Sequence, residues 1–318
     1  MNSNDKHPLC IVSLGGNTLI RRNEKGTIEE QFTHTEAYTK HISRMIADGW
    51  RVVMTHGNGP IVGNILIRNE AAKNTIPPMP LYICDADSEG GIGYMIQQTL
   101  YNNLKRINQV RDIVTVITQV VVDKDDPAFR NPSKPIGPFY SKDEAETVKK
   151  ERGWIMVEDS GRGYRRVVPS PRPVRIIESG VIKHLSGEGI IVIAAGGGGV
   201  PVTELPGGNL HGVDAVIDKD LVTSLLAREI CAHCFINLTQ VDMVYLNYGK
   251  NNQEGLRDVG VEDLKNYYDQ GHFPPGSMGP KIEAAIEFLK AGEKEVIITS
   301  PELIGDAMEG RAGTRIHG

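Results

Sequence analysis

The chain has little of several residue types, and each shortage narrows what it can be. It holds four cysteines in 318 residues, too few for a disulfide framework and typical of a reducing compartment. Aromatic residues make up 6% and the net charge is −5, so neither base-stacking platforms nor a basic field for nucleic acid is indicated. No apolar run reaches the roughly 20 residues of a membrane span, and the polar N-terminus does not fit a signal peptide. We therefore expect a cytoplasmic protein that acts on small molecules, with neither nucleic acid nor membrane as a partner.

Two common nucleotide motifs are also missing. No G-x-x-x-x-G-K-[ST] is present, and "GNGPIVG" spaces its glycines one residue too wide for G-x-G-x-x-G, so neither a P-loop nor a dinucleotide site is indicated. Cys231 and Cys234 form a C-x-x-C pair, but no second pair with ligand spacing follows. We interpret them as small buried hydrophobic residues rather than as a metal or redox site.

Glycine, by contrast, is concentrated directly after three apolar runs, "CIVSL", "RVVMTH" and "IIVIAA". The residues concerned are Gly15, Gly16 and Asn17, then Gly57, Asn58 and Gly59, then a run of four that includes Gly196 and Gly197. A turn needs only one or two glycines, and a flexible linker mixes glycine with serine. Bare backbone allows N–H groups to approach a phosphate closely, so the three clusters predict phosphate-binding loops.

Short β-branched runs alternate with helical patterns along the chain. The pattern predicts helices over 35–47, 61–73, 93–107, 174–185, 221–230 and 281–289, and a β-run over "DIVTVITQVVVD". Alternation of this kind predicts an α/β fold, with a mainly parallel central sheet covered by helices. Ligands of such sheets gather at the carboxyl ends of the strands, where the three glycine clusters fall. We expect one domain over 1–318.

One proline-rich segment, 123–173, interrupts the alternation. It contains "DDPAFRNPSKPIGPFYS" and "VVPSPRPV" around a charged helix-like patch and short β-like pieces such as "RRVVP". Two interpretations stay open: a surface excursion without a role, or an inserted lid or protruding subdomain over the site, because long ordered insertions are often functional.

Two lysines lie where helix stability alone would not place them. Asp218 is the expected N-cap of a helix whose first turn holds Lys219, and Pro280 fits a first helical position that Lys281 follows. A cation at a helix N-terminus opposes the helix dipole. Either both lysines are simply solvated, or an anion outweighs the dipole, as a phosphoryl group in transfer would. Asp220 could orient Lys219, help hold a magnesium ion, or stabilise the helix dipole.

Other titratable residues carry weaker signals. Asp85, Asp87 and Glu89 precede the helix expected from Gly93, and acids there stabilise a helix start more often than they bind a metal. His56, just before "GNG", is interpreted as a packed or backbone-bonded histidine rather than as a base.

A series of phrases, spread in order over nearly the whole chain, resembles the carbamate kinases. They include "SLGGNTL", "HGNGPIVGN", "KPIGPFYS", "RRVVPSPRP", "AAGGGGVPV", "VIDKD" and "MGPKIEAA", of which "KPIGPFYS", "RRVVPSP" and "VIDKD" are specific. The resemblance implies the amino acid kinase fold, an open αβα sandwich, acting as a homodimer. It also implies the reversible reaction of ATP and carbamate to ADP and carbamoyl phosphate, with Mg²⁺.

The resemblance also implies roles for single residues. Lys134, Lys219 and Lys281 would contact the transferring phosphoryl group, and Asp220 would position the lysines. Backbone amides of the three glycine clusters would hold the phosphoryl group and carbamate. Residues expected near the nucleotide are Asp218, Tyr245, Met278 and Gly279. Glu89, Gln240 and Thr18 differ from the residues usual in the family. These differences affect the fine tuning of the carbamate and adenine pockets, not the phosphoryl transfer.

Two other functions fit parts of the pattern. A kinase of the same superfamily acting on an amino-acid carboxylate such as acetylglutamate would need a clamp for a second carboxylate, and the motifs around the first two glycine loops contain no arginine. A sensor that binds nucleotide or carbamoyl phosphate without turnover could lose the transfer lysine without penalty, whereas this chain keeps all three lysines and all three glycine loops.

Overall fold

The computed structural model describes residues 8–16, 19–20, 24–159, 161–274, 276–290, 292 and 294–318. Within these ranges the main sheet has eight strands in the order β15-β17-β16-β12-β1-β2-β9-β3. Their bounds are β1 Leu9–Leu14, β2 Arg51–His56, β3 Ile113–Val116, β9 Ile191–Ala194, β12 Cys234–Leu238, β15 Asp258–Gly260, β16 Glu295–Thr299 and β17 Thr314–His317. Neighbours run parallel except β16 and β17, so the predicted mainly parallel sheet is confirmed.

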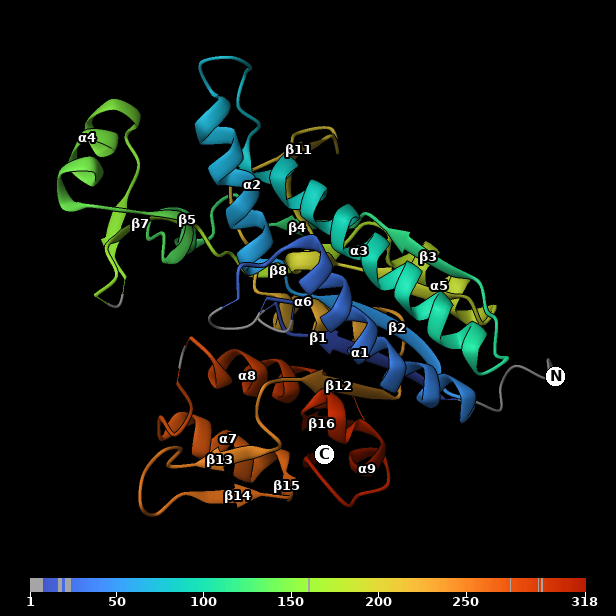
Figure 1. The fold of residues 1–318 in the computed structure, drawn as a ribbon. Helices are drawn as coiled ribbons and strands as arrows, with labels where there is room; N and C mark the ends of the chain where they lie inside the picture. Colours follow the sequence, from blue (N-terminus) through green and yellow to red (C-terminus); the bar gives the residue numbers. More distant parts are fainter. Residues whose placement is uncertain are drawn as a thin grey trace.

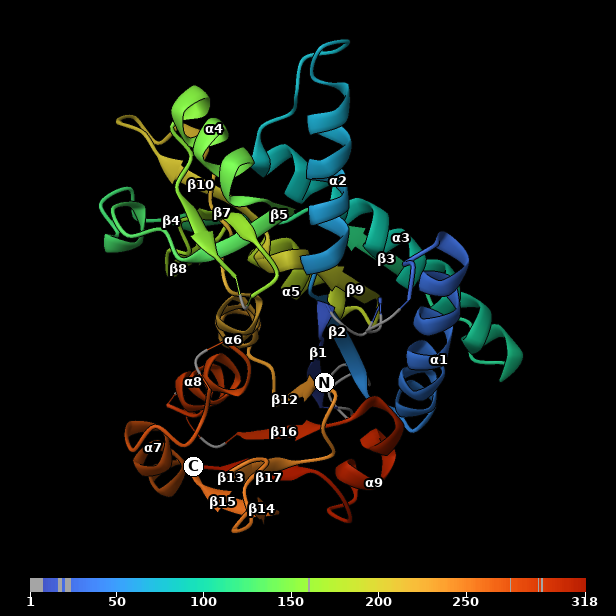
Figure 2. The same ribbon diagram turned by 60° about the vertical axis from the view of Figure 1, so that its left-hand side comes forward.

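Helices cover both faces of this sheet, as Figures 1 and 2 show. One face packs against α1 Ile28–Ala47, α3 Leu81–Arg106 and α9 Ile304–Met308, and the other against α5 Ser179–Gly187, α6 Lys219–Glu229, α7 Val261–Asp269 and α8 Met278–Leu289. β1 shows why both faces are apolar, because successive side chains of a strand point to opposite sides. Leu9 and Ile11 enter one core, and Cys10, Val12 and Leu14 enter the other. The predicted αβα sandwich is confirmed.

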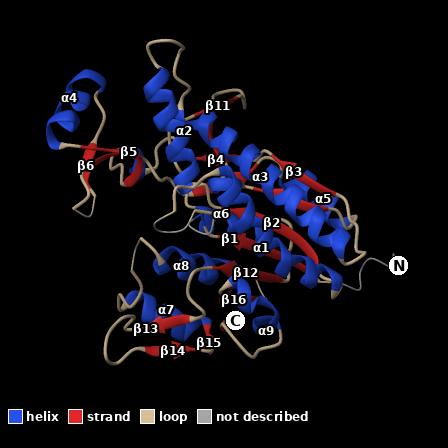
Figure 3. Cartoon of the chain, in the orientation of Figure 1, coloured by secondary structure: helices blue, strands red, loops and turns tan. Residues whose placement is uncertain are grey.

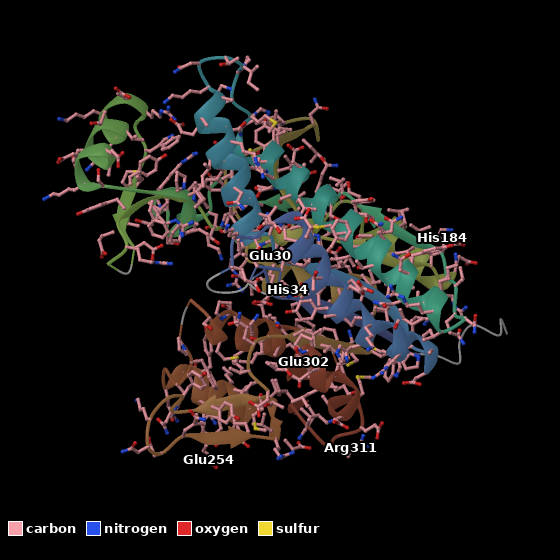
Figure 4. The ribbon with its side chains drawn as sticks, viewed as in Figure 1. Glu30, His34, His184, Glu254, Glu302 and Arg311 are labelled. Atoms are coloured by element: carbon pink, nitrogen blue, oxygen red, sulfur yellow. The ribbon has the colours of Figure 1, made fainter. Side chains whose placement is uncertain are left out.

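Several helix starts differ from the predicted ones for identifiable reasons. α1 begins at Ile28 after a capping box between Thr27 and Glu30, and the polar character of its first turns hid them from the apolar pattern. Figure 4 labels Glu30 and His34 in this part of the helix. The helix expected over 174–185 begins at Ser179, because β8 Pro173–Ile176 precedes it.

The largest difference is α3, which begins at Leu81 rather than at Gly93. Gly93 lies inside the helix and serves close packing, because a Cβ there would lie 2.3 Å from the Thr115 side chain of β3. Asp85, Asp87 and Glu89 therefore lie inside the helix, and their interpretation as acids in front of a helix is wrong.

Smaller sheets lie beyond the carboxyl edge of the main one. The run "DIVTVITQVVVD" is two strands, β3 of the main sheet and β4 Gln119–Val122 of a sheet ordered β11-β10-β4-β8, with β10 Val200–Glu204 and β11 Leu210–Gly212. The hairpin of β13 Val244–Leu246 and β14 Glu254–Leu256 adds a further pair. None of the helices in the described ranges is long and apolar enough to cross a membrane.

Within the segment 123–173, residues 134–168 contain a sheet of their own. β5 Lys134–Tyr140, β7 Tyr164–Val168 and β6 Met156–Glu158 pair in that order, and α4 Lys142–Arg152 connects β5 to β6. This unit stands to one side of the main sheet, next to α2 Gly59–Ala72 (Figures 1 and 3). Whether it acts as a separate subdomain stays a prediction.

Candidate active site

Four neighbouring strands end at one edge of the main sheet and bring their loops together. In the order β12-β1-β2-β9, three are followed by a glycine cluster. The N–H of Gly57 donates to the carbonyl of Leu14 at 2.9 Å, and a Cβ at Gly57 would lie 2.5 Å from the Gly16 nitrogen. Only glycine fits at this contact between the first two loops.

A cleft of about 720 Å³ opens at this edge. The expected site residues that line it are Gly15, Gly16, Gly57, Asn58, Gly59, Lys134, Gly197, Asp218, Lys219, Asp220 and Lys281. Gly196, Tyr245, Met278 and Gly279 lie outside the lining, although Ser277 and Pro280 belong to it. Asn17, and Thr18 with it, lies outside the described residues.

Two lysines share one buried carboxylate on the floor of the cleft. The Nζ of Lys219 lies 2.6 Å from Oδ1 of Asp220, and the Nζ of Lys281 lies 3.1 Å from its Oδ2. Lys219 also donates to the Ser13 hydroxyl of β1 at 2.9 Å, and Lys281 to Oδ1 of Asn237 in β12 at 3.1 Å. Asn237 in turn donates to Asp220 at 2.7 Å. Both ammonium groups are thus held at fixed positions.

The charges in this cluster are strongly coupled. Burial by itself would raise the pKa of Asp220, but the ammonium groups of Lys219 and Lys281 outweigh it and hold that pKa well below its usual range. Burial lowers the pKa of Lys219, with Asp220 acting in the opposite direction. Two cations around one anion leave a net positive charge, which is what a phosphoryl group needs from its surroundings.

Asp218 ties the cluster to the β5 sheet. Its side chain caps α6 by accepting from the N–H of Asp220 at 2.9 Å, and its other oxygen pairs with the Nζ of Lys134 at 3.2 Å. The predicted N-cap and the first-turn position of Lys219 are confirmed. Pro280 is not at the first position of its helix. α8 begins at Met278, directly after the N-cap residue Ser277.

α3 holds the second and third glycine loops from behind. The two carboxylate oxygens of Glu89 accept from the N–H groups of Thr118 and Gly196 at 3.1 and 2.8 Å. One turn away, Asn58 donates to Ser88 at 2.9 Å and to Asp85 at 3.3 Å. The face of α3 that carries these three side chains therefore sets the spacing between the two loops.

Burial shifts the ionisation of this region. It raises the pKa of both Asp85 and Glu89 to about 8, and it lowers the pKa of His56 to about 4. His56 is fully buried, with Nδ1 3.3 Å from the carbonyl oxygen of Gly57. The interpretation of His56 as a packed, backbone-bonded residue is confirmed, since a neutral imidazole without solvent contact cannot receive a proton from substrate.

The described residues contain no group of three or more His, Cys, Asp or Glu side chains able to hold a metal ion. Cys234 is buried, as expected, and pairs in register with Cys10 across β12 and β1. Cys231 is exposed and lies 3.3 Å from the Lys183 Nζ, so its interpretation as a buried residue is wrong. It sits in the turn between α6 and β12, outside the packed strand.

Some residues that line the cleft or hold its lysines were not predicted from the sequence. Ser13 and Asn237 are polar residues inside fully buried strands, and that contrast was a signal that could have found them. Arg162 and Arg165 line the cleft from the β5 sheet and flank the Phe139 ring, at 4.7 and 5.1 Å from its centroid. No local pattern marked these two arginines.

Comparison with known proteins identifies the family of the chain. The model of the amino acid kinase family matches residues 8–300. The carbamate kinase of Pyrococcus furiosus is 49% identical over 96% of this chain and 98% of its own. The carbamate kinase-like protein YahI of Escherichia coli is 48% identical over 97% and 98%. The carbamate kinase of Giardia lamblia bound to AMP-PNP superposes with a TM-score of 0.94 at 42% identity, covering 98% of this chain and 99% of that one.

The chain therefore belongs to the amino acid kinase family. Within that family its near full-length relatives group it with the carbamate kinases, phosphotransferases that act on carbamate. The resemblance that the sequence motifs indicated is confirmed.

Proposed function

We propose that the chain transfers a phosphoryl group reversibly between ATP and carbamate, giving ADP and carbamoyl phosphate. The observation that carries the proposal is the Lys219, Asp220 and Lys281 cluster beside the glycine loops. A buried, net positive floor at the carboxyl edge of a parallel sheet suits a small anionic substrate.

Such a reaction needs no strong base. Carbamate is already an anion, so one of its oxygens can bond to the γ-phosphorus while the bond to the bridging oxygen of ADP breaks. The chain has to align two anions and screen their repulsion. Lys219 and Lys281 supply positive charge, and Asp220 keeps both ammonium groups in place. The N–H groups of the glycine loops bind phosphoryl and carbamate oxygens in this proposal.

Lys134 reaches the cleft from a different part of the chain. β5 carries it to the rim, where Asp218 orients it and more than a third of its side chain remains exposed. In this position it can bind a phosphoryl oxygen once substrate displaces the carboxylate. The β5 sheet acts as a cover for the cleft in this proposal. Tyr245, Met278 and Gly279 stay proposed for the nucleotide, next to Ser277 and Pro280 of the lining.

Mg²⁺ belongs to the proposal as a partner of the nucleotide. The oxygens of Asp220 are engaged by two lysines and Asn237, and those of Asp218 by an N–H group and Lys134. These residues therefore fit a Mg²⁺ ion whose ligands come mostly from the nucleotide phosphates, as is common for this ion. When bound, it neutralises charge on the β- and γ-phosphates. The AMP-PNP complex of the Giardia relative supports nucleotide binding at this fold.

We also propose a homodimer and a cytoplasmic location. α3 exposes Ile83, Tyr94 and Tyr101, and Ile117 is exposed beyond β3. β3 ends the main sheet in the described residues, so its outer edge is open to another strand. A second copy could cover this apolar face. The four described cysteines are unbonded, which supports a reducing compartment.

The decisive experiment is ATP formation from ADP, Mg²⁺ and carbamoyl phosphate, with Lys219→Ala and Lys281→Ala beside the parent chain. Each variant should lose at least ~100-fold in kcat, the effect of removing one electrostatic contact to the transition state. Lys265→Ala, at an exposed position of α7, should keep full activity.

Two outcomes would redirect the assignment. Binding of ADP without turnover by the parent chain would favour a sensor. Turnover with an amino-acid carboxylate in place of carbamate would favour the related kinase activity, with Arg162 or Arg165 of the cleft as the clamp.

A further inference from the structure

The β5 sheet separates two hollows. Phe139 of β5 and Arg165 of β7 line the catalytic cleft. The residues next to them, Tyr140 and Arg166, line a second cavity of about 320 Å³ between this sheet and α2. We call this second hollow the outer cavity. Neighbouring residues of a strand point to opposite faces, so the same pair of strands serves both.

The walls of the outer cavity are mostly apolar. They comprise Leu66, Met79, Leu81, Ile136, Tyr140 and Trp154, together with prolines of the segment before α3. Apolar and aromatic walls with few polar groups are characteristic of sites for small organic molecules. The volume suits a ligand of one or two rings.

One acidic side chain at this cavity is already neutralised. Glu70 of α2 accepts from both terminal nitrogens of Arg152 and pairs with Lys73, and the arginine lowers the pKa of Glu70 against the opposing effect of burial. Its carboxylate is thus in no position to repel an anion or to bind a cationic ligand strongly.

Arg166 differs from Arg152 in having unused donors. One terminal nitrogen donates to Asp214 at 3.4 Å, a long contact, and Asp214 itself accepts from the N–H of Leu81. In the described part of the chain no acceptor faces the Nε or the other terminal nitrogen of Arg166. Its guanidinium stacks on Trp154, 4.5 Å from the ring centroid, with a fifth of the side chain exposed.

We propose that the outer cavity binds a small aromatic carboxylate. The ring occupies the space lined by Leu66, Leu81 and Trp154, and the carboxylate accepts a charge-assisted hydrogen bond from the terminal nitrogen of Arg166 that has no protein acceptor. Because Ile136 belongs to both hollows, the ligand holds β5 in place and with it keeps Lys134 paired with Asp218, the pair that substrate has to break in the proposed function. The bound ligand therefore lowers kcat and leaves the KM for ADP unchanged.

Calorimetric titration of the full chain without nucleotide tests binding, with indole-3-carboxylate as the probe. We expect saturable binding with a dissociation constant of about 1 mM or tighter for a ligand of this size. Neutral indole should bind more weakly, and acetate, which has the head group alone, should not bind. This arm does not depend on the proposed function. Absence of saturation at tenfold higher concentration, or loss of binding in the presence of ADP, overturns the proposal.

Arg166→Gln locates the ligand. It should weaken indole-3-carboxylate by at least about tenfold, the effect of a lost charged hydrogen bond, while indole binding stays as in the parent chain. Arg175→Gln, at an exposed arginine of β8 paired with Glu204, is the matched control and should bind both probes normally. Equal loss in the two variants contradicts the assigned site. A probe that binds but raises the KM for ADP contradicts the link through β5.

Discussion

At the scale of single residues, the site depends on charges that are buried before any substrate arrives. Asp220 offsets two lysines, whereas Glu89 accepts from loop backbone and Asp85 accepts from the Asn58 side chain, both without a nearby cation. Their pKa values accordingly move in opposite directions, below the usual range for Asp220 and to about 8 for the other two. Asp220 positions charged groups, Glu89 positions loop backbone, and Asp85 positions the Asn58 side chain.

Glu89→Gln should change how stability depends on pH. The folded chain holds a proton on Glu89 up to about pH 8, whereas the unfolded chain releases it near pH 4, so this group costs stability as pH rises across that window. We expect the free energy of unfolding of the variant, measured relative to that of the parent chain, to be higher at pH 9 than at pH 6.5 by about 1 kcal/mol or more. Urea unfolding at the two pH values measures this.

The same comparison has an internal check. Asp85 remains in the variant and has a pKa raised to about 8, so part of the pH dependence should persist. Equal pH slopes for Glu89→Gln and the parent chain would show that Glu89 ionises as freely in the folded chain as in the unfolded one.

At the scale of elements, the strand ends act as one assembly. The loops after β1 and β2 touch through backbone at Gly16 and Gly57, and α3 sets the distance from the β2 loop to the β9 loop. Moving any one of these loops therefore displaces its neighbour.

Gly57 and Gly59 of the β2 loop distinguish the effect of the contact with Gly16 from that of any glycine-to-alanine change in this loop. Gly57→Ala places a Cβ 2.5 Å from the Gly16 nitrogen, whereas a Cβ at Gly59 has nothing within 4 Å. Gly57→Ala should lower the free energy of unfolding by roughly 1–3 kcal/mol and reduce kcat by tenfold or more. Gly59→Ala, at the start of α2, should unfold at the parent temperature or above. Thermal unfolding of both variants measures this difference in stability. Equal unfolding midpoints for Gly57→Ala and Gly59→Ala would contradict the close contact at Gly57.

Much at this scale could be predicted from the sequence, and some could not. Strands buried on both faces, each followed by glycine, identified β1, β2 and β9 and the edge where the site lies. The prediction began α3 twelve residues late, at Gly93, whose close packing against Thr115 is a contact that no local pattern encodes. The pairing of Lys219 with Ser13 joins residues 206 apart, and the cleft position of Arg162 depends on how the β5 sheet docks.

At the scale of the whole molecule, the main sheet ends in an open edge strand beside an apolar helix face. β3 and the exposed tyrosines of α3 lie on the side opposite β15 in the strand order. Open edges of this kind invite pairing with a second chain, which supports the proposed dimer.

Combined Tyr94→Glu and Tyr101→Glu substitutions should separate that dimer. Two charges on a face that becomes buried should raise the dissociation constant by at least about 100-fold, which sedimentation velocity detects as a shift to monomer. Tyr248→Glu, at a tyrosine that is 60% exposed near the β13 hairpin, is the control and should leave the dimer intact. Sedimentation of the parent chain as a monomer would contradict the proposed homodimer.

The shared wall of β5 has a consequence for how this enzyme can evolve. Ile136 contributes atoms to the catalytic cleft and to the outer cavity at once. A substitution there that tunes one hollow alters the other, so the two cannot drift independently. Related chains that change Ile136 should therefore carry compensating changes on the α2 side, at Leu66 or its neighbours.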